Sequence, residues 1–362
     1  MFVFLFILVA GLVLIYANVS PIAPGKKGKL IALGILVAVF LGMFFRHTMA
    51  GSIMVAFTSV WLCQALLLYI PWDLFRGVRR LVVRRAMQPK MLMFASRILL
   101  AATIALTLGL FAYGVPHNGN YKLLETTANT SKSNFSAVFF SDVHVDPLFK
   151  RAKLERMIAD VDSIAPDYLL FGGDLADVSM EQLDEWGYDS LFKKLTSKAK
   201  VAAVAINGNH EGMQEGPGMA PGEWMRKVGF VVLDDSSACI GQACFTGRTD
   251  FQVARRRGVE RVPLAALVPR DPERLWILMD HQPKGIESEY TGRLPDYAFS
   301  GHTHNGQFFP GTVVIKLVWR LAYGEGVLDG VRWLVSAGVD CWGPPVRVGS
   351  DADMWVIRFK NQ

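Results

Sequence analysis

Apolar residues dominate the first third of the chain and form four stretches separated by short polar segments: Met1–Ala17, Leu30–Phe45, Met49–Ile70 and Ile98–Val115. A helix needs about 20 residues to cross a hydrocarbon core about 30 Å thick, with a range of about 17 to 25. The second stretch is short, so residues at the membrane interface would have to complete it. Buried helices of a soluble protein are the alternative, but four nearly uncharged stretches leave no polar face for water. The pattern therefore predicts a membrane domain over residues 1–115 with about four transmembrane helices.

The first stretch could instead be a signal peptide, which has a positively charged start and a small-residue cleavage site. Met1–Tyr16 carries no charged side chain, which favours a helix that stays in the protein. The segment between the second and third stretches holds only Arg46, whereas the segment between the third and fourth holds seven Lys and Arg residues. Basic residues in short loops remain in the cytoplasm. We therefore expect everything from about Pro116 onward to lie outside the cytoplasmic membrane.

The formal net charge of +6 is divided unevenly along the chain. Residues 1–115 hold 11 Lys and Arg and a single acid, Asp73, so this part carries +10 and the remainder carries −4. The excess of basic residues therefore reflects membrane topology. No cationic surface for nucleic acid is expected.

Residues 116–133 are polar and rich in Asn, Thr and Ser, which predicts a linker. Beyond it, helical spacing at 154–163 and 180–195 alternates with short runs of β-branched and aromatic residues. The predicted strands are 136–140, 168–171, 201–206, 231–234, 244–247, 275–279, 297–300 and 332–336. Alternating strands and helices are typical of an α/β sheet, and the later hairpin-rich part adds antiparallel strands. The pattern predicts one α/β (α+β) domain over residues 134–362.

Two of the four cysteines lie in a predicted hairpin. Cys239 and Cys244 flank a turn at Gly241–Gln242, and this register places them opposite each other, close enough for a disulfide. A disulfide there would fit an oxidising exterior, and two free thiols remain the alternative. Cys341 has no evident partner in the sequence.

Groups able to bind metal follow almost every short strand. The clusters are Ser141-Asp142-Val143-His144, Gly172-Gly173-Asp174, Asn207-Gly208-Asn209-His210-Glu211, Asp280-His281 and Gly301-His302-Thr303-His304. The carboxyl ends of strands in α/β folds meet at one edge of the sheet, where ligands bind. A single histidine of this kind is more often a hydrogen-bonded core or loop residue. Five of the seven histidines of the chain fall in these clusters, however, and together with the acidic residues they predict a metal site.

The predicted ligands are imidazole, carboxylate and amide groups. They are Asp142, His144, Asp174, Asn209, His281, His302 and His304. This mixture suits Mn, Fe or Zn, and the sequence has no thiolate cluster of the kind that holds structural zinc. Seven ligands are too many for one ion. They match two divalent metal ions about 3.5 to 4 Å apart that share a carboxylate and clamp a phosphoryl group.

The five clusters resemble, in order and spacing, the signature blocks of the calcineurin-like metallophosphoesterases. Together they span residues 137–307. The segment Gly338–Gly349, which contains Trp342 and Arg347, is similar to the C-terminal signature of the bacterial membrane-anchored branch of this family. The resemblance implies a four-layer domain in which two packed mixed β-sheets are flanked by helices. Two residues depart from the family pattern, because Asn305 stands where glycine is common and Asp280 where an apolar residue is usual.

The resemblance also implies a role for each residue of the site. The first metal ion would be held by Asp142, His144, Asp174 and His304, and a second, bridged by Asp174, by Asn209, His281 and His302. A hydroxide bridging the metals would attack phosphorus, with Asp174 and His210 as catalytic residues. His210 would stabilise the developing charge or protonate the leaving oxygen, and Asn209 and His210 would contact substrate. Glu211 and Asp280 would orient ligands, and a surface position for either is the alternative.

A phosphoesterase beside a bilayer meets lipid-borne substrates at a raised effective concentration. The expected function is therefore hydrolysis of a phosphodiester, pyrophosphate or phosphomonoester bond in a lipid or cell-envelope substrate, at the plasma membrane of a bacterium. A non-enzymatic binding protein with a vestigial site is one alternative, and the complete ligand set argues against it. A transporter is another, but the apolar stretches contain hardly any ionisable residue at mid-depth.

Overall fold

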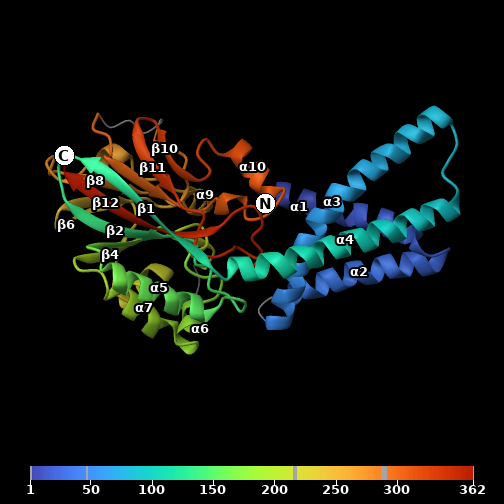
Figure 1. The fold of residues 1–362 in the computed structure, drawn as a ribbon, viewed down its shortest axis with the longest axis horizontal. Coiled ribbons are helices and arrows are strands. Elements are labelled where there is room, and N and C mark those ends of the chain that lie inside the picture. The colour runs from blue at the N-terminus through green and yellow to red at the C-terminus, as the bar shows by residue number, and fades with distance from the viewer. Residues whose placement is uncertain (1, 46–47, 215–217, 287–291, 362) are drawn as a thin grey trace. The chain divides into compact units, whose positions relative to one another are not determined.

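The structure is a computed structural model that describes residues 2–45, 48–214, 218–286 and 292–361. The chain divides into two compact units, Met1–Val115 and Pro116–Gln362 (Figure 1). The described part of the first unit contains helices and no strand, and all the described strands belong to the second unit. The chain therefore combines a helical part with a sheet-based part.

The first unit contains α1 (Phe2–Val19), the 3₁₀ turn η1 (Ser20–Ile22), α2 (Lys26–Phe44), α3 (Met49–Val83) and most of α4 (Pro89–Asn118). Three of these helices, α2, α3 and α4, are long and apolar enough to cross a membrane. The first predicted span forms α1, but its described apolar part, Val9–Ile22, is shorter than a full span. The described residues thus support three spans, where about four were predicted.

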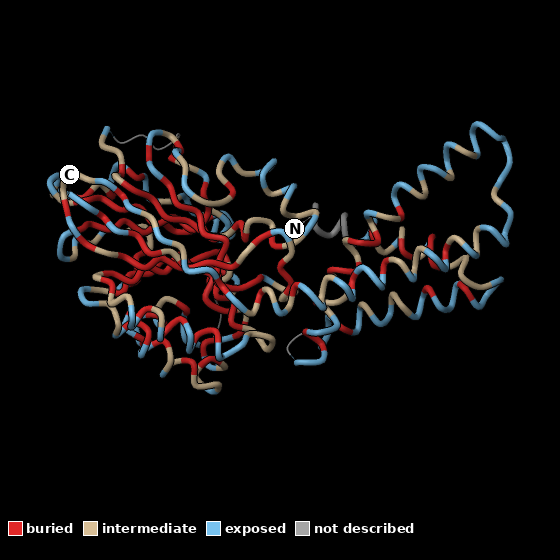
Figure 2. Tube along the Cα trace, viewed as in Figure 1, coloured by how far each residue is buried: buried red, intermediate tan, exposed pale blue. Residues whose placement is uncertain are grey.

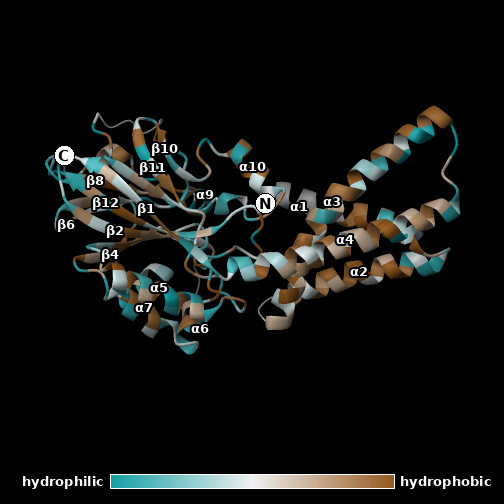
Figure 3. Ribbon diagram, viewed as in Figure 1, coloured by the Kyte–Doolittle hydropathy of each residue, from teal (hydrophilic) through white to brown (hydrophobic). Residues whose placement is uncertain are grey.

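One side of α3 packs against the neighbouring helices. Val60, Trp61, Ala65 and Tyr69 are buried there, and the Trp61 indole Nε1 donates a hydrogen bond to Thr103 Oγ1 of α4 at 2.9 Å. Much of the remaining helix surface is apolar and exposed, and Figure 3 shows how these helices are dominated by apolar residues. Helices satisfy their own backbone hydrogen bonds, so such surfaces are stable in contact with lipid.

Two six-stranded sheets form the second unit. The first has the strand order β1 (Tyr121–Thr130), β12 (Ala352–Asn361), β2 (Phe135–Phe140), β3 (Tyr168–Phe171), β4 (Ala202–Ile206) and β5 (Phe230–Leu233). The second has the order β10 (Gly324–Leu328), β11 (Val331–Val335), β9 (Tyr297–Ser300), β8 (Leu275–Met279), β7 (Ala243–Gly247) and β6 (Ser236–Ile240). Both sheets are mixed, because β12–β2, β10–β11 and β6–β7 are antiparallel pairs and the other pairs are parallel.

The helices and 3₁₀ turns of this unit lie between the strands along the chain. They are α5 (Arg151–Ile164), α6 (Met180–Glu185), α7 (Tyr188–Thr196), η2 (Glu211–Met213), α8 (Pro221–Lys227), α9 (Phe251–Arg257), η3 (Leu264–Leu267), η5 (His304–Gly306) and α10 (Gly311–Val318). The predicted helix at 180–195 is two helices in the structure. The chain breaks at Gly187, whose φ of 72° is left-handed and ends the helical pattern between α6 and α7.

The two sheets pack face to face, and the residues of β2 show how. Ala137 and Phe139 point into the core between the sheets, whereas Val138 and Phe140 point to the helices on the outer face of the first sheet. Both faces are buried, so the strand reads as an unbroken apolar run rather than an alternating one. Figure 2 shows this buried interior along both sheets.

Helices α5, α6, α7 and α8 cover the outer face of the first sheet, with Phe192 and Trp224 fully buried against it. The outer face of the second sheet is covered by η3 and neighbouring loops, where Leu264 packs with Trp276 and Trp333. The predicted arrangement of two packed mixed sheets flanked by outer layers is thereby confirmed.

The predicted linker at 116–133 is wrong for most of its length. The last apolar helix continues to Asn118, and Tyr121–Thr130 forms β1, which pairs in parallel with β12 along its whole length. Because β1 is an edge strand, most of its side chains are polar and solvent-facing, and only Tyr121 and Ala128 are buried. Backbone hydrogen bonding to a strand more than 200 residues later holds it in place, and no local pattern predicts that pairing.

The predicted hairpin of the two cysteines is present. β6 ends at Ile240, β7 begins at Ala243, and Cys239 pairs with Cys244 across the ladder. The two sulfurs form a disulfide in the structure. The register that follows from the Gly241 turn is therefore the one that allows the bond.

Candidate metal centre

The predicted ligands lie in loops at the carboxyl ends of β2, β3, β4, β8 and β9. Within the first sheet, β2, β3 and β4 are parallel neighbours, and β8 and β9 are parallel neighbours in the second. Backbone hydrogen bonds join these loops: Asp142 N donates to Gly173 O at 2.9 Å, and His302 N donates to the Asp142 carboxylate at 3.1 Å. One edge of the packed sheets therefore collects all five loops.

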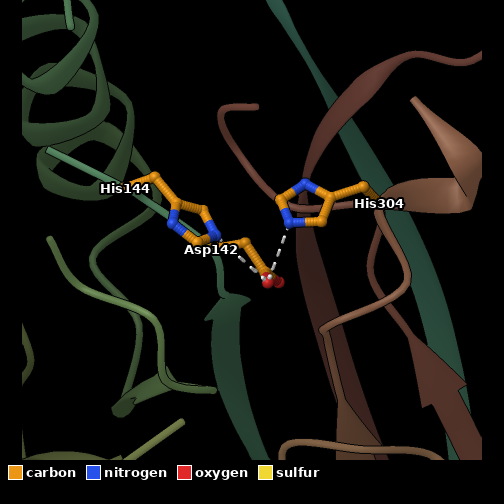
Figure 4. Close-up of side chains that lie close together, drawn as sticks. All are labelled: Asp142, His144 and His304. Carbon is orange, nitrogen blue, oxygen red and sulfur yellow. Dashed lines mark ion pairs between the residues drawn. The ribbon is translucent and has the colours of Figure 1, made fainter. Parts of the chain in front are cut away.

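One group of possible metal ligands consists of Asp142, His144 and His304. His304 Nε2 lies 3.4 Å from Asp142 Oδ1, and His144 Nε2 lies 3.9 Å from the same oxygen. Figure 4 shows both imidazoles turned towards this carboxylate. All three residues are buried.

A second group consists of Asp174, His281 and His302. His281 Nε2 lies 3.1 Å from Asp174 Oδ2, and the rings of His281 and His302 are 5.1 Å apart. His144 of the first group is also near, with its Nε2 at 3.6 Å from Asp174 Oδ2. The Asp174 carboxylate therefore lies between the two groups, as expected of a ligand that two ions share.

Asn209 is held beside Asp174 by the backbone. The N–H of the next residue, His210, donates to Asp174 Oδ1 at 2.8 Å. Asn209 itself is 5% exposed, and its Oδ1 has no hydrogen-bond partner. The structure thus brings together all seven predicted ligands and His210 at one edge.

Hydrogen bonds at the other ring nitrogen fix the histidine rings. His281 Nδ1 lies 2.8 Å from Gly172 O, and His304 Nδ1 lies 3.2 Å from Asp340 O. A carbonyl oxygen only accepts, so Nδ1 carries a proton in both rings, and Nε2 is the atom that faces the centre and could bind a metal ion. This is the arrangement in which metal-binding histidines are usually oriented.

Several buried atoms at the centre form no hydrogen bond within the protein. His144 Nε2, Asn209 Oδ1 and His281 Nε2 form no hydrogen bond although each is inaccessible to solvent. Buried polar groups without partners are rare and destabilising, by about 1 to 3 kcal/mol each. These three atoms are the ones that predicted metal coordination would use, so the residues fit divalent cations.

The ligand backbone is strained. Five non-glycine residues with left-handed backbone are predicted ligands: Asp142 (φ 54°), His144 (45°), Asp174 (60°), His302 (71°) and His304 (49°). Side chains rarely adopt this conformation, and each instance costs about 1 to 3 kcal/mol unless the surroundings impose it. Such strain gathers at functional sites, which is a reason independent of sequence motifs to place function here.

The carboxylates give the centre a negative field. Burial lowers the pKa of His281, but the nearby Asp174 outweighs burial and raises this pKa well above its usual value. Burial dominates in His304 and lowers its pKa to about 3. The site therefore favours positive charge among its carboxylates while keeping His304 neutral, and a divalent cation meets both conditions.

Asp177 was missed by sequence reasoning. Its Oδ1 lies 2.5 Å from His210 Nδ1 and 3.3 Å from His144 Nδ1. Burial works to raise the pKa of Asp177, but His144 and His210 outweigh it, so the pKa lies below its usual value and the group is ionised. The sequence signal that could have identified Asp177 was its position three residues after Asp174, in the same strand-end loop.

Glu211 is buried, so the surface alternative is wrong for this residue. Its carboxylate accepts hydrogen bonds from the backbone N–H groups of Asp174 (3.0 Å), Leu175 (2.5 Å) and Gly208 (2.6 Å). Glu211 thereby joins the loops after β3 and β4, which carry Asp174 and Asn209. Asp280 is also buried, and Arg261 pairs with its carboxylate at 2.5 Å.

Arg347 organises the segment that resembles a C-terminal signature. The side chain is fully buried and its guanidinium donates to five backbone carbonyls, those of His304, Ala337, Gly338, Asp340 and Asp351. The carbonyl oxygen of Asp340 also accepts a hydrogen bond from His304 Nδ1. Arg347 therefore supports His304 through the backbone, and lysine would offer too few donors to replace it.

Two packed mixed sheets with a carboxylate–imidazole centre at their shared edge define a metal-binding α/β domain. Residues 135–306 match the model of the family described as calcineurin-like phosphoesterase. The chain therefore carries a calcineurin-like metallophosphoesterase domain.

Relatives with curated descriptions agree with this family. An uncharacterized metallophosphoesterase of Helicobacter pylori is 27% identical over 247 residues, which cover 67% of this chain and 65% of that protein. One of Aquifex aeolicus is 28% identical over 61% of this chain and 84% of its own. A transmembrane protein with metallophosphoesterase domain of Danio rerio is 27% identical over 64% of this chain and 54% of its own. The chain thus spans just under two thirds of the Helicobacter protein and about half of the Danio protein.

Proposed function

We propose that this chain is a membrane-anchored, metal-dependent phosphoesterase that binds two divalent metal ions. The convergence of the seven predicted ligand side chains at one edge of the sheets carries the proposal, together with the atoms of His144, Asn209 and His281 that form no hydrogen bond. Asp142, His144, Asp174 and His304 would hold one ion, and Asp174, Asn209, His281 and His302 the other. When bound, such ions activate a water for attack on phosphorus and neutralise phosphate charge.

His210 supplies the acid in this proposal. Its Nδ1 is paired with the ionised Asp177, which leaves Nε2 to donate a proton to the leaving oxygen. The ring lies 4.6 Å from that of His144, at the edge of the ligand cluster. Asn209 would contact a phosphate oxygen as well as metal.

The substrate class follows from the membrane helices. A domain tethered at a bilayer meets phosphate groups of lipids or of envelope polymers at a raised effective concentration, without any added contact. We therefore assign a phosphodiester, pyrophosphate or phosphomonoester in such a substrate. A charge of −4 on residues 116–362 gives no support to a nucleic acid substrate.

The test uses the purified full-length chain with bis-p-nitrophenyl phosphate, after metal removal by EDTA and dialysis. We expect hydrolysis to be lost on removal and to return with Mn(II), because no residue of the site replaces the ions in activating water. Elemental analysis should find two ions per chain in the active protein. Metal binding without any hydrolysis would instead favour a non-enzymatic binding protein.

The catalytic unit is proposed to lie outside the cytoplasmic membrane, on the periplasmic or extracellular side of a bacterial cell. The seven basic residues between the third and fourth apolar stretches support this orientation. The disulfide of Cys239 and Cys244 also supports it, since disulfides persist in oxidising compartments.

A pair of fusions at the C-terminus tests the orientation in bacterial cells. Alkaline phosphatase is expected to be active there and green fluorescent protein to be dark, because the first needs an oxidising exterior and the second folds in the cytoplasm. The same fusions placed after Arg85, in the basic segment, provide the control and should give the opposite result. Fluorescence at the C-terminus would reverse the proposed orientation.

A further inference from the structure

An apolar helix on the surface of the second unit, α10, leaves several large apolar side chains exposed. α10 follows closely after the ligand His304 and has no buried residue. Val313, Val314, Leu317 and Val318 are 51% to 82% exposed, and helical spacing places them on one side. Contiguous exposed apolar side chains of this kind mark an interaction surface.

The segment just before α10 is hydrogen-bonded to the loop 340–351. Gln307 Nε2 donates to Trp342 O at 3.2 Å and to Pro344 O at 2.7 Å, and Ser350 Oγ donates to Gln307 O at 2.8 Å. Phe308 forms a parallel bridge with Val348. These contacts hold α10 in a defined place, so its apolar side does not result from a loose segment.

The same loop holds the last residues of α4. His117 Nε2 lies 3.2 Å from Ser350 O and 3.0 Å from Asp351 Oδ1, and Asn118 Nδ2 donates to Asp340 Oδ1 at 2.6 Å. α4 is the last described helix that is long and apolar enough to cross a membrane. The loop 340–351 therefore contacts both the segment before α10 and the point at which the chain would leave the bilayer.

We propose that α10 lies in the bilayer interface, with its valine and leucine side chains at the acyl boundary and Lys316 towards the headgroups. The proposal rests on the membrane anchoring proposed above. We favour lipid as the occupant, because the loop 340–351 contacts both the segment before α10 and the end of the proposed membrane helix α4. Trp342 of this loop is 52% exposed, and tryptophan is typical of membrane interfaces.

This placement bears on the substrate. The Trp342 ring lies 5.9 Å from the ring of His210, and the Trp319 ring, directly after α10, lies 5.5 Å from that of His302. The side chains that border the metal centre therefore belong to the segments that would touch lipid. A docked α10 would bring the centre to the depth of lipid phosphate groups, so the substrate phosphate is one that a lipid carries at the bilayer surface.

Fluorescence quenching in nanodiscs tests the docking. Full-length Cys63→Ala protein carrying Leu317→Cys is labelled with an environment-sensitive fluorophore; Cys341 is buried and the other two cysteines are bonded. The matched control is Val201→Cys, also exposed and apolar but located before β4, at the opposite end of the strand from the site. Phosphatidylcholine with a nitroxide near the headgroup should quench the label at 317 several-fold more than that at 201, and aqueous iodide should do the reverse.

Equal quenching at the two positions, or none at 317, would overturn the docking. Disulfide-linked dimers of the unlabelled Leu317→Cys protein, in place of lipid quenching, would mean that a second copy covers α10. Hydrolysis of bis-p-nitrophenyl phosphate by the labelled proteins is measured alongside. Hydrolysis without quenching would contradict only the docking of α10. Quenching without hydrolysis would contradict only the proposed phosphoesterase activity.

Discussion

Replacing Asp174 with asparagine is expected to lower kcat/KM for bis-p-nitrophenyl phosphate by more than about 100-fold. Residues that merely orient a metal ligand typically contribute about 10 to 100-fold, and loss of a ligand shared by two ions should exceed that range. The Asp174 carboxylate lies within 3.6 Å of His144 Nε2 and 3.1 Å of His281 Nε2, so its neutralisation affects both ligand groups. Steady-state kinetics with elemental analysis would measure the loss of activity and of bound metal together.

Asp162→Asn is the matched control for this substitution. Asp162 lies on α5, its side chain is 61% exposed, and it pairs with Lys198 at the surface. We expect kinetics and metal content close to those of the parent, since exposed ion pairs contribute about 0 to 1 kcal/mol. An Asp174→Asn protein that keeps two ions and full activity would contradict the assignment of the shared ligand.

Replacing His210 with alanine is expected to lower kcat for a dialkyl-type phosphodiester by about 100-fold or more, with little change in the metal content. General acid catalysis contributes about 10² to 10⁴-fold, and His210 is the imidazole at the centre that is not a predicted ligand. The measurement compares two substrates, bis-p-nitrophenyl phosphate and a dialkyl-type phosphodiester. The loss should be larger for the second, because an alkoxide needs a proton to leave and p-nitrophenolate hardly does.

The Asp177→Asn variant tests whether the pair of Asp177 and His210 acts in proton transfer or only supports the fold of the site. It keeps the shape of the side chain but removes the charge that faces His210 Nδ1. We expect a smaller loss than in His210→Ala with the same preference between the substrates. Equal losses for both substrates in both variants would indicate that the pair only supports the fold of the site.

The ligands were predictable from sequence because each lies directly after a short apolar strand. Parallel strands end at one edge, so Asp142, Asp174 and Asn209 were expected to meet once the strands were recognised. The strands themselves were evident because the central strands are buried on both faces, which makes runs such as Ala137–Phe140 wholly apolar. The turn at Gly241 likewise predicted the pairing of the two cysteines.

Other features depend on contacts that no local pattern encodes. The polar edge strand β1 was taken for a linker because its pairing with β12 is made by backbone atoms. Glu211 and Arg347 act by hydrogen bonds to backbone groups, several of them in distant loops, and residue type alone left a surface position open for Glu211. The break at Gly187 was hidden because the apolar spacing of α6 and α7 continues across it.

Residue type and spacing along the chain were enough to predict the apolar helices, the order of the polar strand ends and the kind of ligand that each end supplies. Residue type and spacing did not reveal that Asp177 faces His210, that Glu211 joins two ligand loops, or that one loop contacts both the segment before α10 and the end of α4. Each of these requires two packed sheets to bring side chains and backbone groups together across long separations in the chain. Hydrogen bonds act over about 3 Å, and which groups come that close is settled by folding.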